Sequence, residues 1–272
     1  MSKERIDKLL SHEGFGSRKD IRKILRKYEV SVNGKRILDA GFLIDPLEDS
    51  LTIDQEKITL HSNLYLMMNK VMHTVSSNKD GEHQTVFDLL DDSLKTPYLQ
   101  EHLHLVGRLD MDTEGLLLFT TDGNLTHTLI SPKSHVDKTY FCVLEHEESE
   151  SHKEEITKAF GEGIEVGPED NEEGFKTLPA KIKWAGPEEI KKHLNNTSYF
   201  TQTESGKNNL IPEAALLTIQ EGKYHQVKRM FTAVGNKIIF LKRVSMGKLH
   251  LDAALKPGQY RELSEEEIEK LN

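Results

Sequence analysis

The chain lacks the residues and segments that several classes of protein require. Its 272 residues include one cysteine, Cys142, which excludes an intramolecular disulfide and any metal site built from several thiolates. No apolar run approaches the roughly 18 residues of a membrane helix. The first residues carry charges of both signs and lack the apolar segment of a secretory signal. We therefore expect a cytoplasmic protein that does not insert into a membrane.

Charge is segregated along the chain. The formal net charge is -9, yet residues 145–173 hold twelve acidic residues against Lys153 and Lys158, and the tail after Arg261 is also acidic. In contrast, residues 222–251 contain seven lysines and arginines and no acid. Electrostatic binding depends on this local distribution, so the negative total does not exclude a nucleic-acid partner. We expect the acidic segment to be a solvated peripheral loop.

The first 60 residues predict two helices followed by a hairpin. Residues 6–10 have apolar side chains at helical spacing, and Ser17 with Asp20 three residues later marks the start of a second helix. Residues 30–32 then alternate into Asn33-Gly34, a pair that favours a tight hairpin turn. The side of the second helix opposite its apolar stripe carries a row of cations: Arg18, Lys19, Arg22, Lys23, Arg26 and Lys27.

A solvated helix face would explain this basic row, but the order of helix, basic helix and hairpin favours RNA binding. Residues 1–60 resemble the S4 RNA-binding domain through Arg5-Ile6-Asp7-Lys8-Leu9-Leu10, Gly16-Ser17-Arg18 and Val30-Ser31-Val32-Asn33-Gly34. The resemblance implies recognition of folded RNA through its shape and its phosphates. Residues 55–63 are polar, and we expect them to form the linker to a larger domain.

From residue 64 onward the pattern predicts a sheet with few helices. Short apolar runs alternate with turn residues, at 64–68, 103–109, 115–120, 140–144, 214–219 and 238–244. Two helices are expected, at 124–130 and at 225–234, and the second ends at Gly235-Asn236. The polar segment 193–209 predicts a mobile insertion.

One aspartate, Asp110, stands between Arg108-Leu109 and the apolar strand that begins near Gly115. That position predicts a carboxylate at the rim of a buried sheet, where a nearby cation would keep it ionised. The acidic residues at alternate positions, Asp110, Asp112 and Glu114, resemble a calcium-binding loop. The twelfth position of that loop needs a glutamate, and here it is Thr121. A glycosidase that pairs Asp110 with Asp112 is a second alternative, although the turn expected before Gly115 argues against a common direction of the two side chains.

Two further stretches carry candidate functional residues. Tyr140 stands at the mouth of a strand, after Lys138-Thr139, and Lys228 and Arg229 lie on the basic helix. Packing would account for the tyrosine and solvent exposure for the two cations, so neither stretch by itself predicts a function.

Together, the stretches resemble the pseudouridine synthases that act on ribosomal RNA, in particular the small-subunit (16S) branch, which carries an S4 domain in front. The resemblance spans nearly the whole chain. Its most specific segments are Gly107-Arg108-Leu109-Asp110, Thr113-Glu114-Gly115-Leu116-Leu117, Lys138-Thr139-Tyr140, His225-Gln226-Val227-Lys228-Arg229-Met230-Phe231 and Leu241-Lys242-Arg243. The chain departs from the family at Asn69-Lys70-Val71, where the family has Asn-Lys-Pro.

The resemblance implies the role of each candidate residue. Asp110 is implied as the essential carboxylate, either as nucleophile on the sugar or as the base that removes a ribose proton. Its cation is implied to be Lys228, or Arg229 if the alignment slips by one residue, because neighbours on a helix lie about 100° apart. Tyr140 is implied to lie against the base and pass on its proton. Substrate-binding roles are expected for Arg108, Arg229, Lys138, Arg18, Lys19, Arg22, Lys23 and Arg26.

The implied fold is α+β, with a small α/β RNA-binding domain over residues 1–60. A larger, mostly antiparallel mixed-sheet domain with flanking helices is expected over residues 61–272. The implied reaction isomerises a uridine to pseudouridine and needs no cofactor or metal, because no electron or group enters or leaves. The expected partner of this monomer is 16S ribosomal RNA or an assembling small subunit. A catalytically idle RNA-binding assembly factor with the same fold remains the second hypothesis.

Overall fold

The structure is a computed structural model that describes residues 3–46, 48–58, 60, 63–195, 197–199 and 212–271. The chain divides into two compact units. The first comprises Met1–Tyr65, Leu90–His104 and Phe119–Asp122, and the second comprises the rest of the chain. The expected domain boundary near residue 60 stays a prediction. None of the helices in the described ranges is long and apolar enough to cross a membrane.

The first unit contains the two predicted helices, α1 (Ile6–His12) and α2 (Arg18–Lys27). The start of α2 is a capping box, in which the Ser17 hydroxyl accepts from the Asp20 amide and the Asp20 carboxylate accepts from the Ser17 amide. This confirms the predicted helix start. Eleven buried apolar residues form the core of the unit: Ile6, Leu9, Leu10, Ile21, Leu25, Val30, Val32, Ile37, Ile44, Leu51 and Leu60.

The predicted hairpin is also confirmed. It joins β2 (Val30–Val32) to β3 (Lys35–Arg36), and its turn residues Asn33 and Gly34 both have positive φ, 51° and 77°. The strands β5 (Leu51–Ile53) and β6 (Glu56–Ile58) complete a sheet in the order β3-β2-β5-β6. A separate pair joins β1 (Glu4–Arg5) to β4 (Leu43–Ile44).

One expectation for the first unit was wrong. Residues 56–58 form β6 and not a linker, because they pair with β5; residues 59, 61 and 62 of the expected linker lie outside the described residues. In addition, the segment with η1 (Asp92–Leu94) and α3 (Pro97–His102) belongs to the first unit. Tyr98 of α3 packs edge-on against His12 of α1, with 5.2 Å between the ring centroids.

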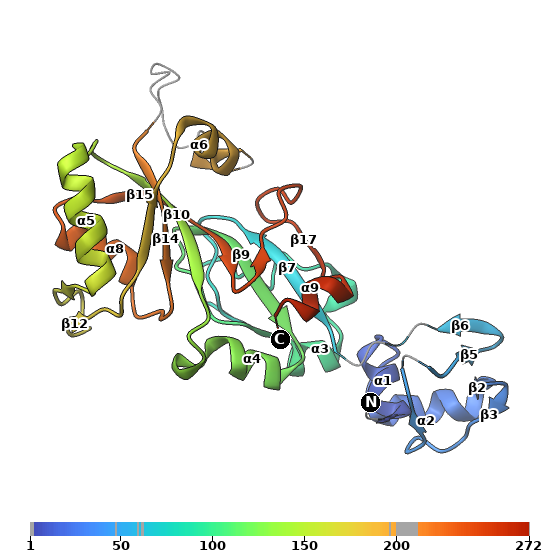
Figure 1. The fold of residues 1–272 in the computed structure, drawn as a ribbon. Helices are drawn as coiled ribbons and strands as arrows, with labels where there is room; N and C mark the ends of the chain where they lie inside the picture. The colour runs from blue at the N-terminus through green and yellow to red at the C-terminus, as the bar shows by residue number, and fades with distance from the viewer. Residues whose placement is uncertain are drawn as a thin grey trace. The chain divides into compact units, whose positions relative to one another are not determined.

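Within the described residues, nine strands of 65–262 form one large sheet (Figure 1). Its main order is β13-β14-β10-β15-β9-β7-β17, with β8 on β9 and β16 on β15. The strands are β7 (Tyr65–Lys70), β8 (His104–Leu105), β9 (Thr113–Thr120), β10 (Lys138–Leu144), β13 (Lys181–Trp184), β14 (Ala214–Ile219), β15 (Ile238–Met246), β16 (Leu249–His250) and β17 (Tyr260–Glu262).

This sheet is mostly antiparallel, as predicted, but its centre holds a parallel pair, β9 with β15, in which Gly115 lies opposite Arg243. All eight residues of β9 are buried. A strand buried on both faces reads as a continuous apolar run, which explains why residues 115–120 were recognisable in the sequence.

Helices flank the sheet of the second unit. The predicted helices are confirmed as α4 (Gly123–Ile130) and α8 (Gln226–Ala233). The other helical segments are η2 (Pro132–Ser134), α5 (Glu150–Glu162), α6 (Pro187–Leu194) and α9 (Glu265–Glu269). Part of the expected insertion 193–209 lies in α6, and residues 196 and 200–209 lie outside the described residues.

The acidic segment 145–173 is not the loop we expected. It contains α5, capped by the Ser149 hydroxyl, and then β11 (Glu165–Val166), which pairs with β12 (Phe175–Lys176). Buried Phe160 of α5 packs edge-on against Phe231 of α8, with 5.4 Å between the ring centroids. The sequence did not predict α5, because acidic residues dominate the segment and the buried stripe of the helix consists of Ile156 and Phe160 alone.

Candidate active site

Asp110 projects from a tight turn directly before β9. The Thr113 amide donates to the Asp110 carbonyl at 3.1 Å, which closes the turn. The preceding residue, Leu109, is buried, and the Ser76 hydroxyl donates to its carbonyl at 2.7 Å and accepts from its amide at 3.1 Å. The backbone on both sides of Asp110 is therefore fixed, while its side chain remains 35% exposed. This arrangement suits a carboxylate that must be both held in place and accessible.

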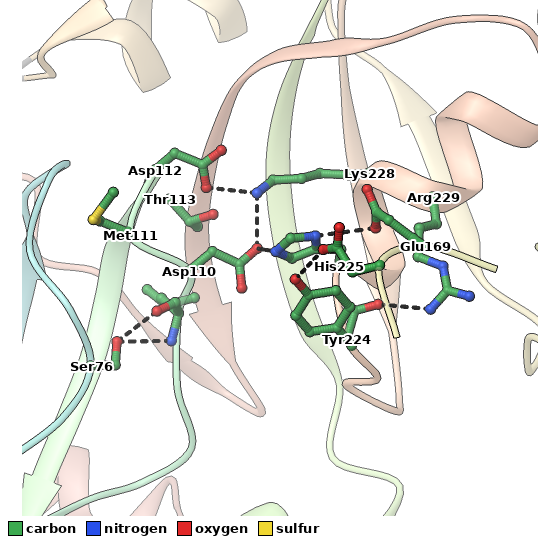
Figure 2. A network of polar contacts seen from close by, with 12 residues as sticks. Ser76, Asp110, Met111, Asp112, Thr113, Glu169, Tyr224, His225, Lys228 and Arg229 are labelled. Carbon is green, nitrogen blue, oxygen red and sulfur yellow. Dashed lines mark hydrogen bonds and ion pairs between the residues drawn. The ribbon is translucent and has the colours of Figure 1, made fainter. Parts of the chain in front are cut away.

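Lys228 is the cation that meets Asp110. It lies near the start of α8, and its Nζ is 2.9 Å from Asp110 Oδ2 and 2.6 Å from Asp112 Oδ1 (Figure 2). Burial lowers the pKa of Lys228, but the hydrogen bond to Asp112 and the charge of Asp110 outweigh this effect, so the pKa is raised. The ammonium thus stays charged between the two carboxylates.

Arg229, the alternative cation, points elsewhere. It is buried, and its guanidinium donates to the carbonyls of Gly167, Glu173 and Tyr224. Neighbouring positions on a helix diverge by about 100°, so Lys228 and Arg229 cannot both face Asp110. The expected contact of Arg229 with a substrate has no support, since its donors are engaged by the protein itself.

Asp112 corrects a second expectation. We expected the turn to direct it away from Asp110, yet both carboxylates meet the same ammonium. The Asp112 side chain is 59% exposed, against 35% for Asp110. Asp112 is therefore the more solvated of the two acids, and the site is not a symmetric carboxylate pair.

The two oxygens of Asp110 have different surroundings. Lys228 Nζ and His225 Nε2 both approach Oδ2, at 2.9 Å and 3.7 Å. Among the residues that the structure describes, none donates a hydrogen bond to Oδ1. In Figure 2, Oδ2 faces the two nitrogens and the second oxygen points away from them. One oxygen thus faces the Lys228 ammonium and the His225 ring, and the other is left for chemistry.

Lys70 contacts the backbone of the turn that carries Asp110 and was not predicted as a site residue. It is fully buried, and its Nζ donates to the carbonyls of Met111 at 3.3 Å, Thr113 at 2.9 Å and Val71 at 3.2 Å. Burial lowers the pKa of Lys70 to about 8, although the charge of Asp110 opposes the shift. A lysine at the end of an apolar strand, as in Asn69-Lys70, was the available signal.

Tyr140 is buried in β10, where it lies opposite Leu217 of β14 and Arg243 of β15. Since Arg243 of β15 also pairs with Gly115 of β9, one strand, β15, lies between Tyr140 and β9. Lys138 is half-buried, and its Nζ donates to the Val136 carbonyl at 3.2 Å. Burial and the charge of Arg243 lower the pKa of Lys138.

The remaining predicted cations are exposed. Arg108 follows Gly107, which has a φ of 75°, directly before the Asp110 turn. The cations of α2 all face solvent in the first unit: Arg18, Lys19, Arg22, Lys23, Arg26 and Lys27. In the part of the chain that is described, no three His, Cys, Asp or Glu side chains are grouped so as to hold a metal ion.

Comparison with known proteins gives two family matches. Residues 64–233 match the family model of RNA pseudouridylate synthases, and residues 4–49 match that of the S4 domain. The second match falls within the segment 1–60 whose motifs resembled that domain, and the first includes Asp110, Tyr140 and Lys228.

Individual relatives match along nearly their whole length. A Bacillus subtilis (strain 168) protein named as an uncharacterized RNA pseudouridine synthase, YtzG, is 42% identical over 269 residues, which are 98% of each chain. Proteins named ribosomal small subunit pseudouridine synthase A are 37% identical in Vibrio cholerae and 34% identical in Escherichia coli K12. These matches cover 97% of this chain, and 97% and 98% of the two relatives.

One solved structure is similar over its whole length. A crystal structure described as a pseudouridylate synthase is 33% identical, with a TM-score of 0.59, and the match covers 99% of this chain and 100% of the other.

Proposed function

This chain belongs to the RNA pseudouridine synthase family and carries an S4 domain, and on that premise we propose that it isomerises a uridine of small-subunit ribosomal RNA through Asp110. The chain is thus an RNA-modifying isomerase. The proposed substrate rests on the full-length relatives named as small-subunit enzymes. The assignment of Asp110 rests on one observation, its carboxylate held through a single oxygen by Lys228.

The reaction breaks the bond from C1′ of the ribose to N1 of uracil, turns the base, and joins C5 to C1′. No electron or group is exchanged with an outside molecule. Asp110 acts in its ionised form, whether it attacks C1′ or removes a ribose proton, because both steps need a free electron pair on oxygen. Lys228 engages Oδ2 at 2.9 Å, and none of the described residues donates a hydrogen bond to Oδ1, so we assign the reacting electron pair to Oδ1.

The target base must leave its helix to reach Asp110. Flipping a nucleotide out of a stack costs a few kcal/mol, least for an unpaired base. We propose that Tyr140 stacks on the uracil, which would return about 1 to 3 kcal/mol, and takes part in removing the proton from C5. Arg108, exposed beside the Asp110 turn, would bind a phosphate or fill the space that the flipped base leaves.

Affinity for RNA is proposed to come from phosphate contacts. The exposed cations of α2 provide one basic surface, and Lys138 is a candidate for a contact closer to the base. Each neutralised phosphate releases counterions, so binding should weaken steeply with salt. A ribosomal substrate would place the protein in the cytoplasm, and we expect a monomer, which sedimentation at several concentrations would test.

The test maps pseudouridines in total RNA from cells with and without this protein. One site missing from small-subunit RNA would identify both reaction and substrate, and a site missing from any other RNA would overturn the proposed target. Purified Asp110→Asn should form no pseudouridine in RNA from the deleted cells yet bind it with nearly wild-type affinity. A wild-type protein that binds this RNA without turnover would instead favour the idle assembly factor.

A further inference from the structure

The acidic loop Gly167–Glu173, between β11 and β12, is attached to the start of α8. Arg229 donates to the Gly167 carbonyl from Nη2 at 2.6 Å and to the Glu173 carbonyl at 2.7 Å, so it binds both ends of the loop. Tyr224 donates its hydroxyl hydrogen bond to Asp170 Oδ2 at 2.7 Å. These contacts present the carboxylate of Glu169 toward the residue that precedes α8, His225.

His225 lies between two carboxylates. Its Nδ1 is 3.1 Å from Glu169 Oε2, and its Nε2 is 3.7 Å from Asp110 Oδ2 (Figure 2). The ring stacks on Tyr224 with 3.9 Å between centroids and 22° between planes. His225 thus contacts Asp110 and Glu169, and it shares its contact with Asp110 Oδ2 with Lys228.

The backbone of His225 is left-handed, with a φ of 47°. For a residue with a side chain this conformation costs roughly 1 to 2 kcal/mol, and the surrounding structure must impose it. It directs the imidazole toward Asp110 at the point where α8 begins. At this position the conformation matters because it places the ring beside Asp110.

We propose that His225 is a positioning residue for Asp110 and that Glu169 holds it in place. The contact of Nδ1 with Glu169 Oε2 at 3.1 Å fixes the ring, and its Nε2 edge then lies 3.7 Å from Asp110 Oδ2. The ring and the Lys228 ammonium thus both lie against Oδ2 of Asp110. Two groups against one oxygen restrict rotation of the carboxylate and keep Oδ1 turned away from them (Figure 2).

This inference rests on the proposed function and assigns a role to an acidic loop that the isomerisation itself does not require. Glu169 of the loop positions Asp110 indirectly, through the imidazole of His225. The contact of His225 is with Oδ2 and not with the reacting Oδ1, so its loss should reduce the rate of the chemical step and leave RNA affinity unchanged.

The test uses variants of the full-length protein that tolerate the left-handed backbone. Asparagine adopts this conformation readily, so His225→Asn should fold but cannot bridge the two carboxylates. We expect its single-turnover rate at saturating RNA to fall about 10- to 100-fold, with the dissociation constant for RNA changed less than about threefold. His225→Gly, which relieves the backbone strain altogether, should show the same loss.

Glu169→Gln tests whether Glu169 holds His225 in place. It should lower the rate about 3- to 10-fold, and the double variant His225→Asn with Glu169→Gln should be no slower than His225→Asn alone, because the two residues act as one unit. The matched control is His135→Asn. His135 has a φ of 48°, nearly the same as His225, but it is exposed and follows η2, so this variant should keep the wild-type rate.

Three outcomes would overturn the inference. The first is a His225→Asn rate within about twofold of wild type, and the second is a defect that lies entirely in RNA affinity. The third is a double variant in which the two defects multiply, which would show that the residues act independently. Each requires an active wild-type enzyme. A wild type without turnover on unmodified small-subunit RNA would instead refute the proposed function and this inference with it.

Discussion

Gly115 of β9 lies so close to Arg243 of β15 that a Cβ atom on the glycine would be 2.2 Å from the Arg243 carbonyl oxygen. The same atom would lie 2.8 Å from the Arg243 amide nitrogen, and Gly115 has a φ of 103°. No side chain fits there without moving backbone. This glycine therefore sets the approach of β15 to the strand that follows Asp110.

Gly115→Ala should lower the free energy of unfolding by about 2 to 5 kcal/mol, since it adds backbone strain to a steric overlap. Urea denaturation would measure the change. The control is Gly123→Ala at the start of α4, where an added Cβ would meet nothing within 4 Å, and its effect should stay within about 0.5 kcal/mol. Equal stability of the two variants would contradict the close approach.

Lys228→Met should reduce turnover about 100-fold or more. The substitution removes the ammonium that lies 2.9 Å from Asp110, and a single preorganised electrostatic contact at a reacting group is worth a factor of this size. Single-turnover formation of pseudouridine at saturating RNA would measure the loss.

Asp112→Asn is the companion variant. It keeps Lys228 on Asp110 and removes a more exposed carboxylate, so we expect a rate within about fivefold of wild type. If Asp112→Asn were as damaging as Asp110→Asn, the two acids would work as a pair. That result would favour glycosidase-type chemistry.

Because of Lys70, the free energy of unfolding should depend on pH in the alkaline range. Burial lowers its pKa in the folded protein from 10.5 to about 8. Between these values the unfolded chain binds more protons than the folded one, so the contribution of Lys70 to stability rises as the pH increases through this window. The difference in unfolding free energy between wild type and Lys70→Met should therefore move in favour of wild type by about 1 to 3 kcal/mol from pH 7 to pH 10.

Denaturation of both proteins at pH 7, 8, 9 and 10 would measure this difference. Lys191→Met supplies the reference, because Lys191 of α6 is exposed and pairs with Glu188 at 3.1 Å. A difference that stays flat for Lys70→Met would show that the lysine keeps its ordinary titration when buried.

The exposed cations of α2 should contribute to RNA affinity and not to the rate of the reaction. Arg22→Ala with Arg26→Ala removes two exposed cations, and each lost phosphate contact should lower the slope of log affinity against log salt by about 1. The rate at saturating RNA should not change. Filter binding from 50 to 300 mM salt gives the slope, and Lys191→Ala with Lys192→Ala, which removes two exposed cations of α6, is the charge-matched control. An unchanged slope would exclude α2 from the RNA interface.

Local signals in the sequence were sufficient for many elements. The capping box of Ser17 and Asp20 and the Asn33-Gly34 turn depend on residues within four positions of each other, so both were predicted correctly. The apolar run of β9 and the stripe of α8 followed from the period of side-chain burial. In contrast, α5 was missed because its acidic surface outnumbers its two buried residues, Ile156 and Phe160.

The sequence by itself determined the family, the order of the main elements and the three segments that carry Asp110, Tyr140 and Lys228. Only the tertiary structure decided which side chains meet. Lys228 and not Arg229 reaches Asp110, Asp112 shares the same ammonium, and His225 connects Asp110 to Glu169. The reason is physical: these pairs lie 56 to 118 residues apart, and no periodicity along the chain encodes a contact made across it.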